Sequence, residues 1–243
     1  MRTYAIGDIH GHLDLLQVAQ DLVAQDRERV GDPSSPLVHV GDLVDRGRQS
    51  RGVIEHLMAG QARGEPWVVL KGNHDRMFAM FMDDPYAHDP MLRQGIGWLH
   101  PHVGGATTLA SYGVRNAEER PPETVHAEAM AAIPPEHQTW IRKLPTHFLH
   151  DESLFVHAGI RPGVDLRHQT EDDMTWIRKE FLEDTRDHGA LVVHGHTAID
   201  KATHYGNRLN MDSSAAYGGP VSAAVIEGRH AWLLTPEGRV ALG

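Results

Sequence analysis

Near its N-terminus the chain reads Thr3-Tyr4-Ala5-Ile6-Gly7-Asp8-Ile9-His10-Gly11, an apolar run that ends in glycine and polar residues. The same order recurs twice. Leu37–Val40 is followed by Gly41-Asp42-Leu43-Val44-Asp45-Arg46-Gly47, and Trp67–Leu70 is followed by Gly72-Asn73-His74-Asp75. Short runs rich in β-branched residues predict strands, and helical patterns between them predict βαβ units with parallel strands.

Two helices are expected between these strands. Leu15, Leu16, Ala19, Leu22 and Val23 fall at helical spacing, and Gly31-Asp32-Pro33 is expected to end that helix. A second helix is expected to follow Ser50, its candidate N-cap, with Gly60 just past its end.

The later chain predicts more strands, some of them parallel and some in an antiparallel meander. Strands are expected at Leu154–Val156 and Leu191–Val193, and the meander at Arg208–Met211, Val221–Ile226, Ala231–Leu234 and Val240–Leu242. The expected fold is α/β, with two mixed β-sheets packed as a sandwich and flanking helices. We expect one domain over residues 1–243, with a helical and loop insertion at 83–150.

Composition excludes several classes of protein. The 243 residues include no cysteine, which excludes disulfides, thiolate metal sites and cysteine nucleophiles. Thirty-three acidic against 23 basic residues give a net charge of −10, so no nucleic-acid partner is expected. No apolar run reaches the about 18 residues of a membrane span, and no targeting leader is visible, so a cytoplasmic location is expected.

The polar clusters that follow the strands carry the functional signal. Ligands of open α/β sheets bind at the carboxyl ends of strands. Two later strands deliver histidines to the same edge, in Phe155-Val156-His157-Ala158-Gly159 and Val193-His194-Gly195-His196-Thr197. Six side chains could therefore meet at one place: Asp8, His10, Asp42, Asn73, His157 and His196. Each motif alone is as consistent with an ordinary turn, but together they predict a site for two divalent ions. Their oxygen and nitrogen donors suit Mn²⁺, Fe, Zn²⁺ or Mg²⁺.

At these motifs the chain resembles the phosphoprotein phosphatase family of calcineurin-like metallophosphoesterases, in particular its bacterial and phage-type serine/threonine protein phosphatases. The family's signature blocks read here as GDIHG, GDLVDRG and GNHD. The resemblance runs from Thr3 to about Ala224 and is thin between Asp83 and His150. It implies the calcineurin-like metallophosphoesterase fold.

The resemblance also implies roles for individual residues. Asp8 and His10 would bind the first ion, and Asp42 would bridge both. Asn73, His157 and His196 would bind the second ion, with Mn²⁺ expected first. The remaining roles fall to four residues: Arg46 and Arg178 bind phosphate, His74 donates a proton, and Asp45 orients His74. Tyr217 resembles an aromatic at the edge of the site in relatives, although a core position is equally open.

The function expected from this set is metal-dependent hydrolysis of phosphomonoesters, by in-line attack of a hydroxide held between the two ions. The expected substrate is a phosphoserine or phosphothreonine protein or peptide. One alternative is a dinucleoside tetraphosphate hydrolase of the same family, in which a small residue is expected in place of Asp45. Another is a phosphoprotein-binding module without turnover, against which the intact ligands, His74 and Asp45 argue.

Overall fold

The first of two sheets is mixed and contains six strands. The computed structural model describes residues 1–243. In spatial order the strands are β11 (Gly238–Leu242), β10 (His230–Thr235), β9 (Ala223–Glu227), β1 (Arg2–Ile6), β2 (Leu37–His39) and β3 (Trp67–Val69). β1, β2 and β3 are parallel, whereas β9, β10 and β11 form the expected antiparallel meander. β1 joins the parallel and the antiparallel parts of the sheet, because it pairs with β2 on one side and with β9 on the other.

The second sheet contains five strands and corrects two expectations. In spatial order they are β4 (His147–His150), β5 (Ser153–Val156), β6 (Leu191–His194), β8 (Arg208–Asn210) and β7 (Thr203–His204). β8 was expected in the meander, but it pairs in parallel with β6. β4 lies at the end of the 83–150 segment, where only helices and turns were expected. Its four residues alternate between exposed and half-buried at the sheet edge, too short a pattern to stand out in the sequence.

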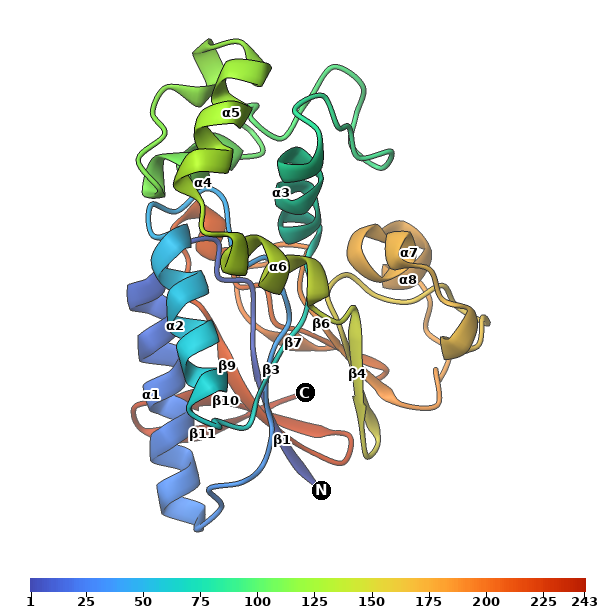
Figure 1. The fold of residues 1–243 in the computed structure, drawn as a ribbon. Coiled ribbons are helices and arrows are strands. Elements are labelled where there is room, and N and C mark those ends of the chain that lie inside the picture. Colours follow the sequence, from blue (N-terminus) through green and yellow to red (C-terminus); the bar gives the residue numbers. More distant parts are fainter.

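Helices cover the outer faces of both sheets (Figure 1). α1 (Leu13–Val30) and α2 (Ser50–Ala62) lie beside the first sheet, and α7 (Glu171–Trp176) and α8 (Lys179–Leu182) lie on the side of the second. Above the strand ends stand α3 (Asn73–Asp83), α4 (Gly105–Ser111), α5 (Pro122–Ala132) and α6 (Pro135–Lys143). Three 3₁₀ turns complete the fold: η1 (Ala117–Glu119), η2 (Leu166–His168) and η3 (Ala215–Tyr217). None of the helices is both long and apolar enough to cross a membrane.

The ends of α1 and α2 agree only in part with the ends that the sequence predicts. α1 ends at Gly31, whose φ of 67° is the left-handed conformation that glycine favours. α2 begins one residue earlier than expected, since Gln49 is its N-cap and Ser50 is already helical. α2 also runs past Gly60. A Cβ at Gly60 would lie 1.8 Å from the ring of Trp67, so this glycine permits the helix to pack against β3 and does not end it.

The core follows the two-residue period of the strands. In β1, Tyr4 and Ile6 point toward α1 and α2, while Ala5 points between the sheets. Ala5 packs there with buried residues of both sheets, among them Phe155 and Val193. Fully burying a large apolar side chain contributes roughly 1.5–3 kcal/mol. This packing holds the sheets face to face and fixes the strand ends that carry the site, as the sandwich prediction required.

Candidate active site

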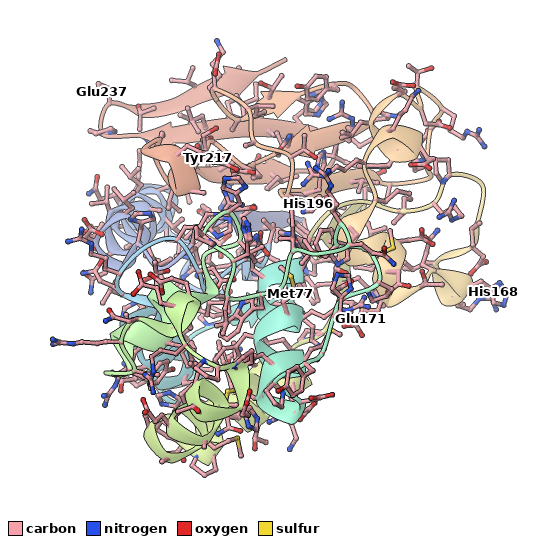
Figure 2. All side chains as sticks on the ribbon, turned by 90° about the horizontal axis from the view of Figure 1, so that it is seen from above. Met77, His168, Glu171, His196, Tyr217 and Glu237 are labelled. Carbon is pink, nitrogen blue, oxygen red and sulfur yellow. The ribbon has the colours of Figure 1, made fainter.

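Five strand ends bring the six predicted metal ligands together. Asp8 and His10 follow β1, Asp42 follows β2, and Asn73 opens α3 after β3. His157 follows β5 and His196 follows β6, so both sheets contribute. All six side chains are buried. In Figure 2, which looks down on the strand ends, His196 lies near the centre of the molecule, whereas His168 and Glu237 lie at its edge.

Three of these ligands form one tight group. The Oδ1 atom of Asn73 lies 3.0 Å from Nε2 of His157 and 2.9 Å from Nδ1 of His196. Oδ1 of Asp42 is 3.3 Å from the same Nε2 atom of His157. The other ring nitrogen of His196, Nε2, is buried and has no hydrogen-bond partner. Asp42, His157 and His196 therefore offer ligand atoms within 4.8 Å of one another, an arrangement that could hold a metal ion.

Two histidines are oriented by backbone carbonyls behind them. Nδ1 of His10 donates to the carbonyl of Val44 at 3.0 Å, and Nδ1 of His157 donates to the carbonyl of Val40 at 3.0 Å. In the neutral form of each ring the proton is on Nδ1, so the lone pair of Nε2 faces the site and is available to a metal ion. Such partners commonly fix the tautomer of metal-binding histidines.

The second group of ligand atoms joins His10, Asp42 and His74. Nε2 of His10 lies 3.4 Å from Oδ2 of Asp42. His74, to which the family resemblance gives the role of proton donor, is thus a member of this group together with the expected ligands His10 and Asp42. The carboxylate of Asp8 accepts the backbone N–H of His196 at 3.0 Å, which joins the first strand end to the last.

The charges around these groups favour bound cations. Burial raises the pKa of Asp8 well above its ordinary range, and the nearby carboxylates of Asp212 and Asp42 raise it further. Burial alone would lower the pKa of His157, yet Asp42 and Asp8 raise it to about 9. Positive charge relieves the repulsion among such buried carboxylates. The buried Asp and His clusters, which share Asp42, therefore fit a dinuclear metal site with oxygen and nitrogen donors.

The site is built on strained backbone. His10, Asp42, Asp45, Arg46 and His196 have positive φ values between 46° and 74°, which non-glycine residues rarely adopt. Each such residue costs on the order of 1–3 kcal/mol, and such strain concentrates at functional sites.

Glycines permit the close approach of the loops. A Cβ at Gly72 would lie 2.1 Å from Oδ1 of Asp42, and a Cβ at Gly195 would lie 1.8 Å from Oδ1 of Asp8. The glycines in the third and fifth strand-end motifs are therefore needed for the carboxylates to reach the centre.

His74 and Asp45 form a buried pair beside the ligands. Nδ1 of His74 lies 2.7 Å from Oδ2 of Asp45, and the backbone N–H of His74 donates to Asp42 at 3.0 Å. Burial alone would lower the pKa of His74, but the charges of Asp42 and Asp45 raise it. The pair therefore favours a protonated ring, which a proton donor requires.

The two predicted arginines contact different residues around the site. The guanidinium of Arg46 lies over the ring of Tyr217, 4.8 Å from its centroid, and its buried Nε has no hydrogen-bond partner. Nη1 of Arg178 lies 3.4 Å from Oγ1 of Thr197, next to His196. Tyr217 is 70% exposed, so it lies at the edge of the site and not in the core.

Sequence reasoning missed several residues that support the site. Asp75 accepts the backbone N–H groups of Leu43 and Gly72, at 3.0 and 2.8 Å, and so joins the second and third motifs. Asp75 stands in the quoted GNHD block, which was an available signal. Trp98 and Thr108 donate to Asp45 from the segment after α3, and no motif surrounds them.

Comparison with known proteins places this site in a family. The family model described as calcineurin-like phosphoesterase matches residues 1–226. The chain belongs to this family. Family membership, together with the two buried ligand clusters, identifies the protein as a metal-dependent phosphoesterase.

Three named proteins illustrate what the chain is similar to. It is 25% identical over 239 residues to the asymmetrical bis(5'-nucleosyl)-tetraphosphatase PrpE of Anoxybacillus flavithermus, covering 90% of this chain and 87% of that one. It is 30% identical over 166 residues to the symmetrical bis(5'-nucleosyl)-tetraphosphatase of Janthinobacterium sp., covering 67% of this chain and 45% of that one. The cold-active protein-tyrosine phosphatase of a psychrophilic Shewanella species shares the fold, with a TM-score of 0.62 and 18% identity over 100% of this chain and 80% of that one.

Proposed function

We propose that this protein hydrolyses dinucleoside tetraphosphates. The observation that carries the proposal is the similarity to PrpE, which spans about nine tenths of both chains. The relatives support this alternative better than the phosphoprotein substrate that the sequence motifs favoured. The exposed ring of Tyr217 beside Arg46 adds support, because an aromatic face next to a phosphate-binding cation suits a nucleotide.

The expected cleavage is asymmetrical. The Anoxybacillus flavithermus relative, which matches 90% of the chain, is an asymmetrical enzyme, whereas the symmetrical one from Janthinobacterium sp. is matched over 45% of its length. Asymmetrical hydrolysis divides the four phosphates into three and one. The products are then a nucleoside triphosphate and a nucleoside monophosphate.

We assign the metal ligands as the family resemblance implies. Asp8 and His10 would hold one ion, Asp42 would bridge, and Asn73, His157 and His196 would hold the other, with Mn²⁺ as the preferred metal. When bound, two such ions activate water as the nucleophile and stabilise the phosphoryl oxygens. The converging donor atoms around Asn73 and Asp42 support this assignment.

The chain's own side chains would perform the remaining steps. Arg46 and Arg178 would bind phosphoryl oxygens, since their planar N–H groups match phosphate geometry. His74 would donate its proton to the leaving oxygen, and Asp45 would hold the ring in position through Nδ1. These roles need the protonated form of His74, which Asp42 and Asp45 favour.

A second candidate, a serine/threonine protein phosphatase, is favoured by one observation. Asp45 is an acid and contacts His74 at 2.7 Å. A serine alkoxide is a poor leaving group and must be protonated, whereas a nucleotide phosphate leaves more readily. An intact pair of this kind is most useful for phosphoserine and phosphothreonine.

Parallel steady-state kinetics with added Mn²⁺ test the proposal. We expect a higher kcat/KM on diadenosine tetraphosphate than on phosphoserine or phosphothreonine peptides, with ATP and AMP as products by chromatography. A preference for the peptides would favour the second candidate. Failure to turn over these substrates and a generic aryl phosphate would indicate a non-catalytic phosphoprotein-binding module.

A further inference from the structure

Trp98 is a buried indole whose polar edge faces the site. It lies between α3 and α4, and only 5% of it is exposed. Its Nε1 donates to Oδ2 of Asp45 at 2.9 Å. The same carboxylate oxygen lies 2.7 Å from Nδ1 of His74. One oxygen thus connects the indole with the ring proposed to donate the proton.

We propose that Trp98 is a positioning residue for proton donation by His74, acting through Asp45. The inference rests on the proposed function only in assigning the proton donor to His74. It gives the segment after α3 a part in the reaction. The indole N–H fixes the direction in which the carboxylate presents Oδ2 to the imidazole.

The other oxygen of Asp45 is held from the same segment. Oγ1 of Thr108 donates to Oδ1 of Asp45 at 2.7 Å and lies 2.8 Å from the backbone nitrogen of Asp45. Asp45 has no exposed surface, so solvent does not replace a lost donor. Removing either donor leaves a buried carboxylate short of a hydrogen bond, and the carboxylate then rotates or shifts toward the remaining partners.

Packing fixes the indole itself. Its ring lies 5.6 Å from that of Phe78 and 4.9 Å from that of Phe81, both on α3, the helix whose first turn carries His74. A Cβ at Gly105 would lie 2.5 Å from the indole, so α4 approaches its face closely. The indole is therefore held between the helix of the proton donor and the helix of Thr108.

Trp98→Phe tests the role, because it removes the N–H and keeps an aromatic ring. Substrates should differ in their leaving groups: an alkyl phosphate, whose alkoxide must be protonated, and 4-nitrophenyl phosphate, whose phenolate leaves without that help. We expect kcat to fall about tenfold on the alkyl phosphate, part of the roughly 10²–10⁴ that a general acid contributes. On the aryl phosphate kcat should change less than about twofold, with KM and metal content unchanged.

Two controls separate positioning from packing. Phe81→Leu disturbs the same aromatic cluster but keeps the indole N–H of Trp98. Any change in kcat should therefore be the same on the alkyl phosphate and on the aryl phosphate. In a His74→Asn background, Trp98→Phe should have no further effect, because its effect acts through that ring. Equal losses on both substrates, or a further loss in the His74→Asn background, would overturn the proposal.

A second variant covers the case in which Trp98→Phe fails to fold. Thr108→Val removes the donor to the other oxygen with little change in volume, and Thr108→Ser restores the hydroxyl. We expect the leaving-group-dependent loss in the valine variant and its rescue in the serine variant. The same loss in both would contradict the proposal. These measurements do not need a dinucleotide substrate. The role of Trp98 can therefore be refuted while the proposed substrate stands, and the proposed substrate can be refuted while the role of Trp98 stands.

Discussion

The strand-end loops and the helical segment at residues 83–143 meet at one site but reach it differently. Each loop places its ligands within a few residues of a strand end, as Asp8 and His10 show after β1. The segment places Trp98 and Thr108 against Asp45 from outside both sheets. The order of the strands determines where the expected metal ligands lie. Packing between segments that are distant in sequence determines where Trp98 and Thr108 lie. Binding and positioning should therefore respond differently to substitution.

The largest effect is expected within the loops, at Asp42. Its carboxylate lies against His10 and His157, one from each ligand cluster. Asp42→Asn should deplete both ions together and lower activity by more than the about 10–100-fold typical of residues that only orient metal ligands. Metal analysis and steady-state kinetics on the purified variant check both effects.

Removing the metal from the wild-type enzyme with a chelator should have the same effect on activity as Asp42→Asn. Activity should disappear on exhaustive chelation and return with Mn²⁺ more than with Mg²⁺. Glu237→Gln, an exposed substitution far from the centre in Figure 2, should change neither metal content nor activity. Two tightly held ions in Asp42→Asn would refute the bridging assignment.

The next effect is expected where the two regions join, at His74. His74→Asn should lower kcat on alkyl phosphates by about 10²–10⁴ while metal content stays intact. The loss should shrink on an activated aryl phosphate, because phenolate needs less protonation. His168→Asn, at the edge of the molecule in Figure 2, is the matched control. Depleted metal in His74→Asn would mean that His74 acts as a ligand, as its place in the first cluster allows.

Local patterns were enough for the three parallel strands of the first sheet. The runs at Thr3–Ile6, Leu37–Val40 and Trp67–Leu70 became β1, β2 and β3 with shifts of one residue at an end. Apolar runs predict buried strands well because both faces of these sheets are covered. The same parallel order of β1, β2 and β3 places the polar residues that follow them at one edge of the first sheet.

Other features depended on partners that are distant in sequence. β8 resembles a meander strand locally, and only its pairing with β6 places it in the second sheet. Gly60 resembles a helix end, but it lies inside α2, where its missing side chain leaves room for the ring of Trp67 on β3. Trp98 lies 53 residues from Asp45 in sequence, with no repeating pattern between them. A single sequence does not encode such contacts as a local signal.

The smallest effect is expected in a network remote from both regions. Asp26 of α1 is buried and accepts hydrogen bonds from Tyr4 of β1 at 2.9 Å and from Arg239 of β11 at 2.7 Å. Arg29 also pairs with it. Burial alone would raise the pKa of Asp26, but the hydrogen bonds from Arg239 and Tyr4 lower it to about 2. The network joins the long helix to both halves of the first sheet.

Asp26→Asn should therefore lower stability without changing the reaction. Losing hydrogen bonds to a charged group should reduce the free energy of unfolding by about 1–3 kcal/mol at pH 7, as urea denaturation would measure. Because folding lowers the pKa of Asp26, its contribution is complete above the ordinary value of 3.8 and is lost as the pH falls toward about 2. The difference in unfolding free energy between wild type and variant should shrink over that pH range.

Glu55→Gln is the control, because it breaks an exposed ion pair with Arg51 and should change stability little. A loss of kcat in Asp26→Asn at full metal occupancy would show that support for the site extends beyond the segment after α3.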